Sequence, residues 1–458
     1  MFNNYFNVAL SQLLRPFIQT IFLLLFANVL SSEVFGQISY AISLISIFLV
    51  IKDLGLSSAF IQNTDHSVSR SAILVFVIIL SVLWIVFAIL FGIIGQYLFN
   101  INNLLLTLVF ISPVILFSNI QLVLQAFHDK EYDFKYVAKS DVISTLIVFV
   151  ISGLLTYYGK YYLSYILLFI LPPLFSSILL YSKLRVKIIF STSIGSIKSL
   201  YKFAKYLSLY NLVNYFYRNF DILLIGAVYG TTQLGIYAIS LKIILLPVQT
   251  LSSIIHRVLF PRYSKMENKQ VVYLNYVKML NTIIRITTPL FLIVYYLSDN
   301  IFGFIIPNKW DSMYPFVQLL IPIGFIQFIN SFNGLILMSS GKTKIMFLWS
   351  IIETLIIAIG FYIGSFYSLQ IFVKIYLLLN IVMFIPDIII VSYSFNKSSI
   401  QLLKSVLIYP GVILFVSFII FNLLNELNID HIIPLVIFSF GLFLFNIYTI
   451  WQKHEYKT

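Results

Sequence analysis

The sequence of 458 residues contains no cysteine and few charged side chains. Without cysteine, the chain can form no disulfide, no thiolate metal site and no thiol nucleophile. The five histidines are scattered, and none has the His-Glu-x-x-His spacing of a zinc enzyme. We therefore expect neither a metal nor a cofactor.

Charged residues make up only 10% of the chain, while 60% of it is apolar. A soluble domain carries about 25% charged residues, so this chain has too few to cover a surface that faces water. Its apolar residues also form runs of about 20, long enough for a helix to cross a hydrocarbon core of roughly 30 Å. The composition predicts an all-α integral membrane protein. The net charge of +13 then reflects topology, and we expect no nucleic acid partner.

Apolar runs between turn residues and charges predict about fourteen transmembrane helices. They cover residues 9–30, 36–56, 71–97, 103–127, 137–158, 161–181, 205–229, 235–258, 276–298, 314–338, 345–363, 368–394, 402–424 and 431–451. If both termini are cytoplasmic, 22 basic residues lie in inside segments and only two, Lys160 and Lys309, lie outside. Positive-inside sorting favours this orientation, since one missed span would invert every later loop.

A long basic segment, 183–205, separates six predicted spans from the other eight. A faint repeat supports a division there, because Gly36 and the string 40–43 (Tyr-Ala-Ile-Ser) are echoed by Gly235 and the string 237–240. We predict an N-terminal lobe in 1–190, a C-terminal lobe in 191–400 and an extra helix pair in 401–458.

The seventh span carries a polar stripe in steps of three and four residues, which places its members on one helix face. The stripe consists of Tyr210, Asn211, Asn214, Tyr217, Arg218 and Asp221. In lipid these groups would be unsatisfied, so they favour a face toward a cavity or another helix.

Basic residues outnumber acids on the spans that carry such polar groups. Arg15, Arg218, Lys242 and Arg285 are set against the single acid Asp221 on spans 1, 7, 8 and 9. An excess of positive charge beside a low-dielectric wall attracts an anion, and a pyrophosphate headgroup with attached sugars fits that description. The predicted substrate-binding residues are Arg15, Asn214, Arg218, Lys242 and Arg285.

Each of these residues also has a structural interpretation. Arg218 and Asp221 could form a local i,i+3 ion pair, and Arg15 and Lys242 could extend toward the membrane surface. Asp387, directly after Pro386, is predicted to be structural at a kinked helix end. Glu353, which is mid-span and has no partner in its own helix, receives no role.

Several strings, taken together and in order, resemble landmarks of the polysaccharide transporter family. They are residues 53–62 (DLGLSSAFIQ), 218–226 (RNFDILLIG), 245–249 (LLPVQ), 257–261 (RVLFP), Lys309-Trp310 with Pro315, and Ser340-Gly341-Lys342. The chain is similar to the Wzx-type O-antigen and capsule-repeat flippases, including the colanic acid exporter type, of the multidrug/oligosaccharidyl-lipid/polysaccharide exporter superfamily.

This resemblance implies a V-shaped fold of two pseudo-symmetric six-helix lobes, with spans 1, 2, 7 and 8 lining a central cavity. It implies a flippase, not an enzyme, that moves undecaprenyl-pyrophosphate-linked oligosaccharide across the bacterial cytoplasmic membrane. Its expected partners are that lipid-linked substrate, membrane lipid and a coupling ion, either H⁺ or Na⁺, with the chain acting as a monomer. Asp221 then either neutralises Arg218 or titrates and links transport to the ion gradient.

Two other functions stay open at this point. A cation-coupled multidrug antiporter of the same superfamily would favour acids in the cavity, whereas this chain has excess base. A polytopic polysaccharide polymerase or ligase would need a long outer loop with catalytic groups, and the longest outer loop predicted here runs only over 298–313.

Overall fold

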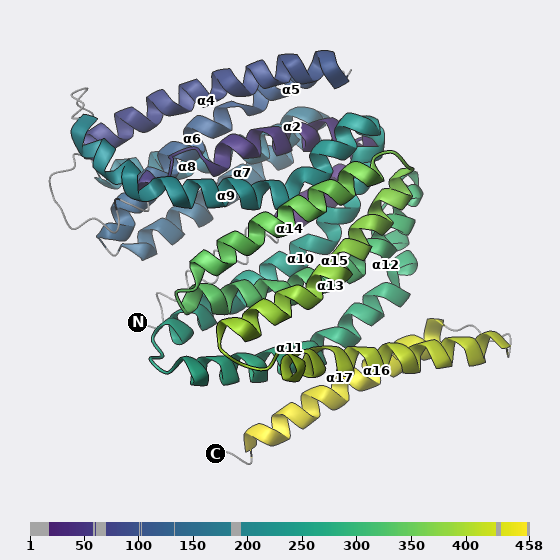
Figure 1. Cartoon of the computed structure of the whole chain (residues 1–458). Coiled ribbons are helices and arrows are strands. Elements are labelled where there is room, and N and C mark those ends of the chain that lie inside the picture. The colour runs from purple at the N-terminus through teal and green to yellow at the C-terminus, as the bar shows by residue number, and fades with distance from the viewer. Residues whose placement is uncertain are drawn as a thin grey trace. The chain divides into compact units, whose positions relative to one another are not determined.

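The computed structural model describes residues 18–57, 60, 70–99, 101, 103–131, 133–184, 194–426 and 432–455, and all regular elements within them are helices (Figure 1). A first helix covers Ile18–Val29. The others are α2 (Ser32–Val50), α4 (Arg70–Phe99), α5 (Leu104–Ile111), α6 (Pro113–Lys130), α7 (Phe134–Tyr157), α8 (Tyr161–Leu184), α9 (Ile194–Val228), α10 (Gly230–Ser264), α11 (Lys269–Tyr296), α12 (Ser298–Ile305), η1 (Asn308–Met313), α13 (Tyr314–Ser339), α14 (Thr343–Gly364), α15 (Leu369–Ser394), α16 (Ser399–Glu426) and α17 (Ile432–Glu455).

Twelve stretches of helix within the described residues are long and apolar enough to cross a membrane. This confirms the predicted all-α, multi-span architecture, while the total of fourteen stays a prediction. The two further predicted spans are the first, described only from residue 18 onward, and the seventh. The seventh lies in α9, which carries the polar stripe and is correspondingly less apolar.

The chain divides into two compact units, residues 1–238 and 239–458. The predicted lobe boundaries at 190 and 400 remain a prediction. In the first unit, α6 packs against α4 and α8, α7 packs against α8, and α2 packs against α5 and α9. An apolar cluster joins α4, α6 and α8 to the segment after α2, where Phe60 meets Phe127 edge to face, with ring centroids 5.0 Å apart.

Ion pairs hold together one end of the first unit, where α4 begins and α6 and α8 end. Arg70 lies 2.6 Å from Glu131, and Lys183 pairs with Asp133, which also lies 3.1 Å from His128 Nδ1. Burial raises the pKa of the Asp133 carboxyl. The hydrogen bonds and positive charges of Lys183 and His128 outweigh that effect, and the pKa ends below its usual value.

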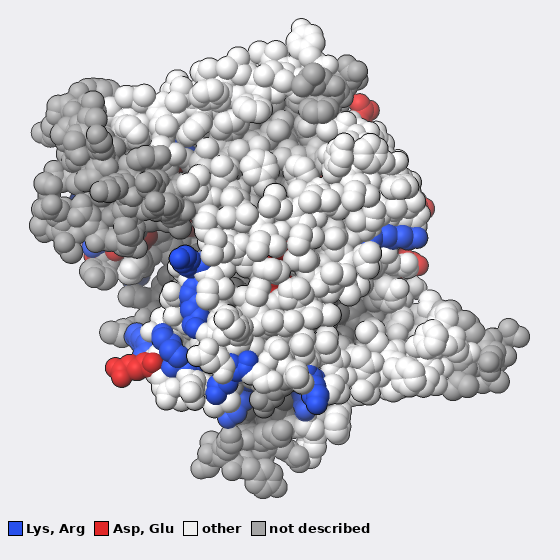
Figure 2. Space-filling view, viewed as in Figure 1, with Lys and Arg blue, Asp and Glu red and all other residues white. Residues whose placement is uncertain are grey.

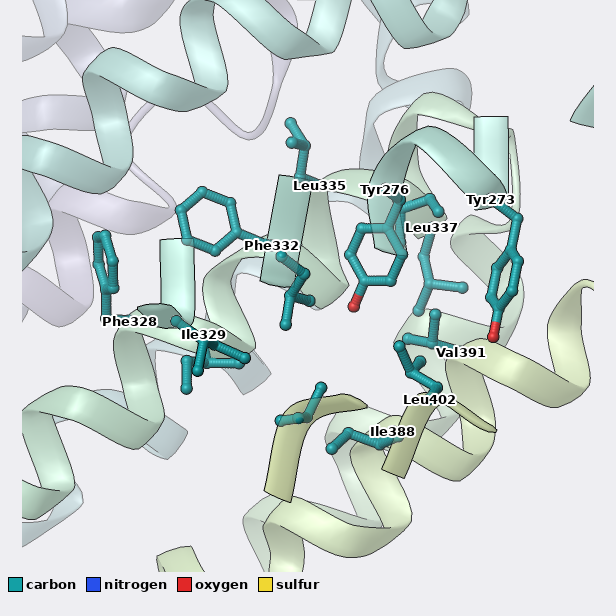
Figure 3. Packing of buried hydrophobic residues seen from close by; sticks show 14 of the residues in the cluster. Tyr273, Tyr276, Phe328, Ile329, Phe332, Leu335, Leu337, Ile388, Val391 and Leu402 are labelled. Carbon is teal, nitrogen blue, oxygen red and sulfur yellow. The ribbon is translucent and has the colours of Figure 1, made fainter. Parts of the chain in front are cut away.

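In the second unit, a buried cluster joins α11, α13, α15 and α16. Figure 3 shows Tyr276 of α11 beside Leu335 and Leu337 of α13, with Val391 of α15 and Leu402 of α16 beneath them. The last two helices, α16 and α17, both pack against α11.

The outer surface of the helices is largely apolar. Along α4, for example, Ile79, Val82, Phe91 and Ile94 are each more than half exposed. Figure 2 shows mostly uncharged atoms on the visible face, with most of its lysine and arginine atoms gathered in one region. A soluble protein rarely exposes so much continuous apolar surface, whereas hydrocarbon would cover it at no cost.

Candidate functional site

The end of α9 and the start of α10, joined by a short turn, bring two polar residues together. The turn between them passes through Gly230, whose φ of +81° suits glycine. Asp221 precedes this turn and Tyr237 follows it by similar numbers of residues, so they face each other. The Tyr237 hydroxyl donates to Asp221 Oδ2 at 2.5 Å.

Among the stripe residues whose side chains the structure describes, Asp221 is the most deeply buried, with 2% of its surface exposed, and Tyr237 is completely buried. The second carboxylate oxygen of Asp221, Oδ1, is buried without a hydrogen-bond partner. A buried carboxylate oxygen without a donor is costly.

Arg218, three residues earlier on α9, is exposed and does not pair with Asp221. Both side chains lie in the described part of the chain, and no ion pair joins them. The local i,i+3 pair that the spacing allowed is thus not formed. Asn211 and Asn214 are half-buried on the same helix, so the stripe runs from exposed or half-exposed groups at Asn214 and Arg218 to a buried acid at Asp221.

The Asp53-Leu54-Gly55 string marks a break in the second span. Helix α2 ends at Val50, and the chain then turns through positive φ angles of +52° at Leu54 and +76° at Gly55. The Asp53 carboxylate accepts hydrogen bonds from the backbone N–H groups of Gly55 (3.0 Å) and Ser57 (2.9 Å). Inside a membrane bundle such a break needs its backbone donors satisfied, and Asp53 does this.

Lys52 lies in the same break, near the end of the predicted span 36–56. Its ammonium donates to Ser118 Oγ (2.7 Å) and to the Ser118 carbonyl (2.9 Å), and its own carbonyl accepts from Asn119. The Asn119 amide also bonds Ser81, eleven residues or about 16 Å from the start of α4. Lys52 is thus a cation well inside the helical bundle, and only the break at Gly55 hints at it in the sequence.

The other three basic residues predicted to bind substrate lie elsewhere in the chain than Arg218 and Lys52. Arg15 is outside the described residues, and Lys242 is half-buried on α10. Arg285 is exposed on α11, with its guanidinium 5.7 Å from the centre of the Tyr409 ring on α16. Asn446 of α17 donates to both the Arg285 carbonyl (3.0 Å) and the Tyr409 hydroxyl. The structure therefore places Arg285 where α11 meets the last two helices.

Asp387, predicted to be structural, lies at the centre of a polar network in the second unit. Its carboxylate accepts from Trp349 Nε1 of α14 at 2.6 Å and from Asn330 Nδ2 of α13 at 2.5 Å. Asn333 donates to Asn330 at 3.1 Å, and Tyr276 of α11 donates to Asn333. Pro386 is accommodated inside α15. The network ties four helices together. Asp387 lies inside α15, which continues to Ser394, and not at a helix end as predicted.

Across the described residues, no group of three or more histidine, aspartate or glutamate residues could hold a metal ion. Asp221 and Asp387 are each the single acid of their clusters.

Comparison with known proteins gives a consistent family assignment. The model of the family described as "Polysaccharide biosynthesis protein" matches residues 25–315. The chain is 26% identical to lipopolysaccharide biosynthesis protein WzxC of Escherichia coli (strain K12) over 38% of its length, and 23% identical to teichuronic acid biosynthesis protein TuaB of Bacillus subtilis (strain 168) over 66%. These alignments span 35% and 63% of the two relatives.

The fold has a counterpart among solved structures over nearly its full length. Lipid II flippase MurJ in an inward closed conformation superposes with a TM-score of 0.76 at 16% identity, covering 99% of both chains. At that identity the likeness establishes the fold.

Proposed function

Because this chain belongs to the polysaccharide biosynthesis protein family, we propose that it is a flippase for lipid-linked oligosaccharide. It moves repeat units carried on undecaprenyl pyrophosphate across the bacterial cytoplasmic membrane by alternating access, for the assembly of surface polysaccharide. It is a multi-pass membrane protein, and we place both termini in the cytoplasm and take the monomer as the working unit. Support comes from the family match, the relatives WzxC and TuaB, and the fold shared with MurJ.

The observation that carries the proposal is that Arg218 is exposed and forms no ion pair with Asp221. Its guanidinium is exposed on a helix that is otherwise built for a membrane, and the nearby acid Asp221 is buried against Tyr237 instead of neutralising it. An arginine in hydrocarbon costs on the order of 3 kcal/mol or more, so it needs water or an anion. A guanidinium also binds phosphate through two parallel hydrogen bonds, which suits a pyrophosphate headgroup.

Other groups on the same unit suit the remainder of the substrate. Asn214 is half-buried one helical turn from Arg218, and its amide can donate to and accept from sugar hydroxyls. Lys52 adds a second cation inside the bundle, held by Ser118. Arg15, Lys242 and Arg285 are proposed as further contacts for the anionic headgroup during transport. The polyprenyl tail stays in lipid throughout.

We propose Asp221 as the group that links transport to a proton or sodium gradient. Its Oδ1 atom is buried without a partner, while Tyr237 holds Oδ2 in place. Binding a cation there would remove the cost of an unpaired buried oxygen. Because Asp221 lies one turn from Arg218, such binding would alter the field at the substrate contact.

The rival functions find less support. A drug antiporter would carry its unpaired acids toward a cationic drug, whereas the exposed stripe residue here is Arg218 and the acid is buried. A polymerase would need a long outer segment that carries its catalytic groups. The predicted outer segment 298–313 is occupied by the short helices α12 and η1.

The test is to delete the gene and ask on which leaflet the lipid-linked repeat unit accumulates. We expect accumulation on the cytoplasmic leaflet, reversed by the wild-type chain and by Arg218→Lys but not by Arg218→Glu. Lys344→Glu, which swaps an exposed charge at the start of α14, is the matched control and should restore transport. Even distribution between leaflets in the deletion strain would end the flippase proposal.

A further inference from the structure

The backbone of Arg285 in α11 is held in place by a residue of the last helix. Pro289, four residues later in α11, has no N–H to donate to the Arg285 carbonyl. Asn446 of α17 supplies the missing donor at 3.0 Å, and its amide also donates to the hydroxyl of Tyr409 on α16. Because Asn446 is only 3% exposed, three helices meet at one buried amide, and Arg285 lies at their junction.

The side chain of Arg285 is exposed at this junction and has no acidic partner. Its guanidinium lies 5.7 Å from the centre of the Tyr409 ring, and no ion pair within the described residues includes it. Since the Tyr409 hydroxyl accepts from Asn446, its own proton is a second donor beside the guanidinium. Helix α11 contains no acid, and the acids of α16 and α17 are their last residues, Glu426 and Glu455. The junction therefore presents a cation and a hydroxyl donor to a ligand from outside the chain.

The end at which α11 begins is the basic end of the second unit. Lys265 and Lys269 adjoin the start of α11 and are exposed. Lys342, in the turn between α13 and α14, lies 4.6 Å from the centre of the Phe395 ring, and that ring lies 5.5 Å from the ring of Tyr273 on α11. Positive-inside sorting assigns this end to the cytoplasm.

Arg285 then lies well inside the hydrocarbon core. A core of about 30 Å takes about 20 helical residues, so counting back from Tyr296, at the outer end of α11, puts the cytoplasmic boundary near Tyr276. Arg285 lies about 14 Å beyond that boundary. Lys278, Thr282 and Arg285 follow one another at steps of four and three, so a polar track runs along one face of α11 from the boundary inward. Side chains lean toward the N-terminus of their helix, so the guanidinium reaches back along this track.

We propose that this junction binds the phosphate of an anionic phospholipid from the cytoplasmic leaflet. An arginine at this depth is costly in hydrocarbon and needs water or an anion. A phosphate accepts two parallel hydrogen bonds from the guanidinium and a third from the Tyr409 hydroxyl. Lys278 adds a second positive charge nearer the boundary. Basic pockets between transmembrane helices on the cytoplasmic side bind anionic lipid headgroups by the same chemistry.

This site goes beyond the proposed function and refines the role given there to Arg285. It assigns a task to the last two helices, because α16 carries Tyr409 and α17 carries the Asn446 amide that fixes both neighbours. The pyrophosphate of the lipid-linked substrate presents similar chemistry, so it competes with the resident phospholipid for the same guanidinium.

Native mass spectrometry of the full chain, purified in detergent, counts bound phospholipid directly. On titration with phosphatidylglycerol, the wild type should bind one lipid about tenfold or more tightly than Arg285→Gln does, because a charge-assisted contact is lost. Arg285→Lys keeps a cation without the planar fork and should lie between the two. Lys374→Gln, which removes an exposed cation from α15, is the matched control and should bind phosphatidylglycerol like the wild type.

Zwitterionic phosphatidylcholine should bind the wild type more weakly than phosphatidylglycerol does. Equal binding of phosphatidylglycerol by the wild type and Arg285→Gln, or equal binding of the two lipids by the wild type, overturns the site. Displacement of the bound lipid by undecaprenyl pyrophosphate at a far lower concentration than phosphatidylglycerol requires would overturn the assignment to phospholipid. The assay involves no transport: lipid binding that depends on Arg285 without any flipping would leave the site standing and remove the proposed function.

Discussion

Removing the Tyr237 hydroxyl tests whether its hydrogen bond to the buried carboxylate of Asp221 stabilises the fold. Tyr237→Phe keeps the ring, which is completely buried, and deletes the donor 2.5 Å from Asp221 Oδ2. Because Asp221 Oδ1 already has no partner, this change leaves the side chain of a buried acid without any side-chain donor. A hydrogen bond to a charged group contributes about 1.5–3 kcal/mol, and we expect a loss of stability of that size.

The reasoning also predicts coupling between the two residues. Asp221→Asn removes the charge, so Tyr237→Phe in that background should cost only about 0.5–1.5 kcal/mol, the contribution of a neutral hydrogen bond. The double-mutant cycle should therefore show a coupling of about 1–2 kcal/mol.

The assay is unfolding of purified protein in mixed micelles, with the free energy compared across the four variants. Tyr97→Phe, at a position 81% exposed, is the control and should change stability by no more than about 0.5 kcal/mol. Additive effects of the two substitutions, or a Tyr237→Phe protein as stable as the wild type, would refute the assignment of this hydrogen bond.

Three further predictions concern the frame around the site. Trp349→Phe removes a donor from Asp387 and should cost about 1–3 kcal/mol in the same unfolding assay, with most of the cost absent in an Asp387→Asn background; equal cost in both backgrounds would contradict it. Because the folded pKa of Asp133 lies below its unfolded value of about 4, the stability it contributes is full above that pH and lost as pH falls through the folded pKa. Lys183→Met should therefore lower the melting temperature at pH 7, and this effect should shrink progressively as the pH falls below about 4; a pH-independent effect would count against the ion pair. Asp53→Ala leaves two backbone donors in the break without partners and should reduce the amount of folded protein in the membrane, measured by detergent-extracted monomer; an unchanged amount would remove the capping role.

The sequence predicted the features that follow from local spacing and composition. Apolar runs located the helices, whereas the single polar face predicted on the seventh span stays a prediction. The all-α, multi-span architecture is confirmed, and the sequence landmarks led to the family that the comparisons establish.

Partners supplied by other helices could not be predicted in this way. The spacing of Arg218 and Asp221 permitted a local pair, but it cannot reveal that Tyr237 of the next helix takes the carboxylate instead. The same limit applies to Arg285, whose neighbours Tyr409 and Asn446 follow it by more than 120 residues.

The hydropathy pattern also missed the break that follows α2, where backbone N–H groups need hydrogen-bond partners inside the bundle. The predicted span 36–56 runs through Lys52, because hydropathy says nothing about a helix that ends at Val50 and breaks inside the bundle. The Asp53-Leu54-Gly55 string was recognisable as a family landmark, but its physical reason, capping of a positive-φ turn, becomes visible only with the hydrogen bonds in hand.

The most direct test of the account is the movement of a fluorescent undecaprenyl-pyrophosphate oligosaccharide in liposomes that contain the purified chain, read by quenching from outside. The wild type and Lys344→Glu should accelerate exchange between leaflets equally. Arg218→Glu should be slower by about tenfold to a hundredfold, the equivalent of losing about 1.5–3 kcal/mol of charge-assisted binding. Exchange by Arg218→Glu as fast as by the wild type would contradict the central claim that this exposed cation binds the anionic headgroup.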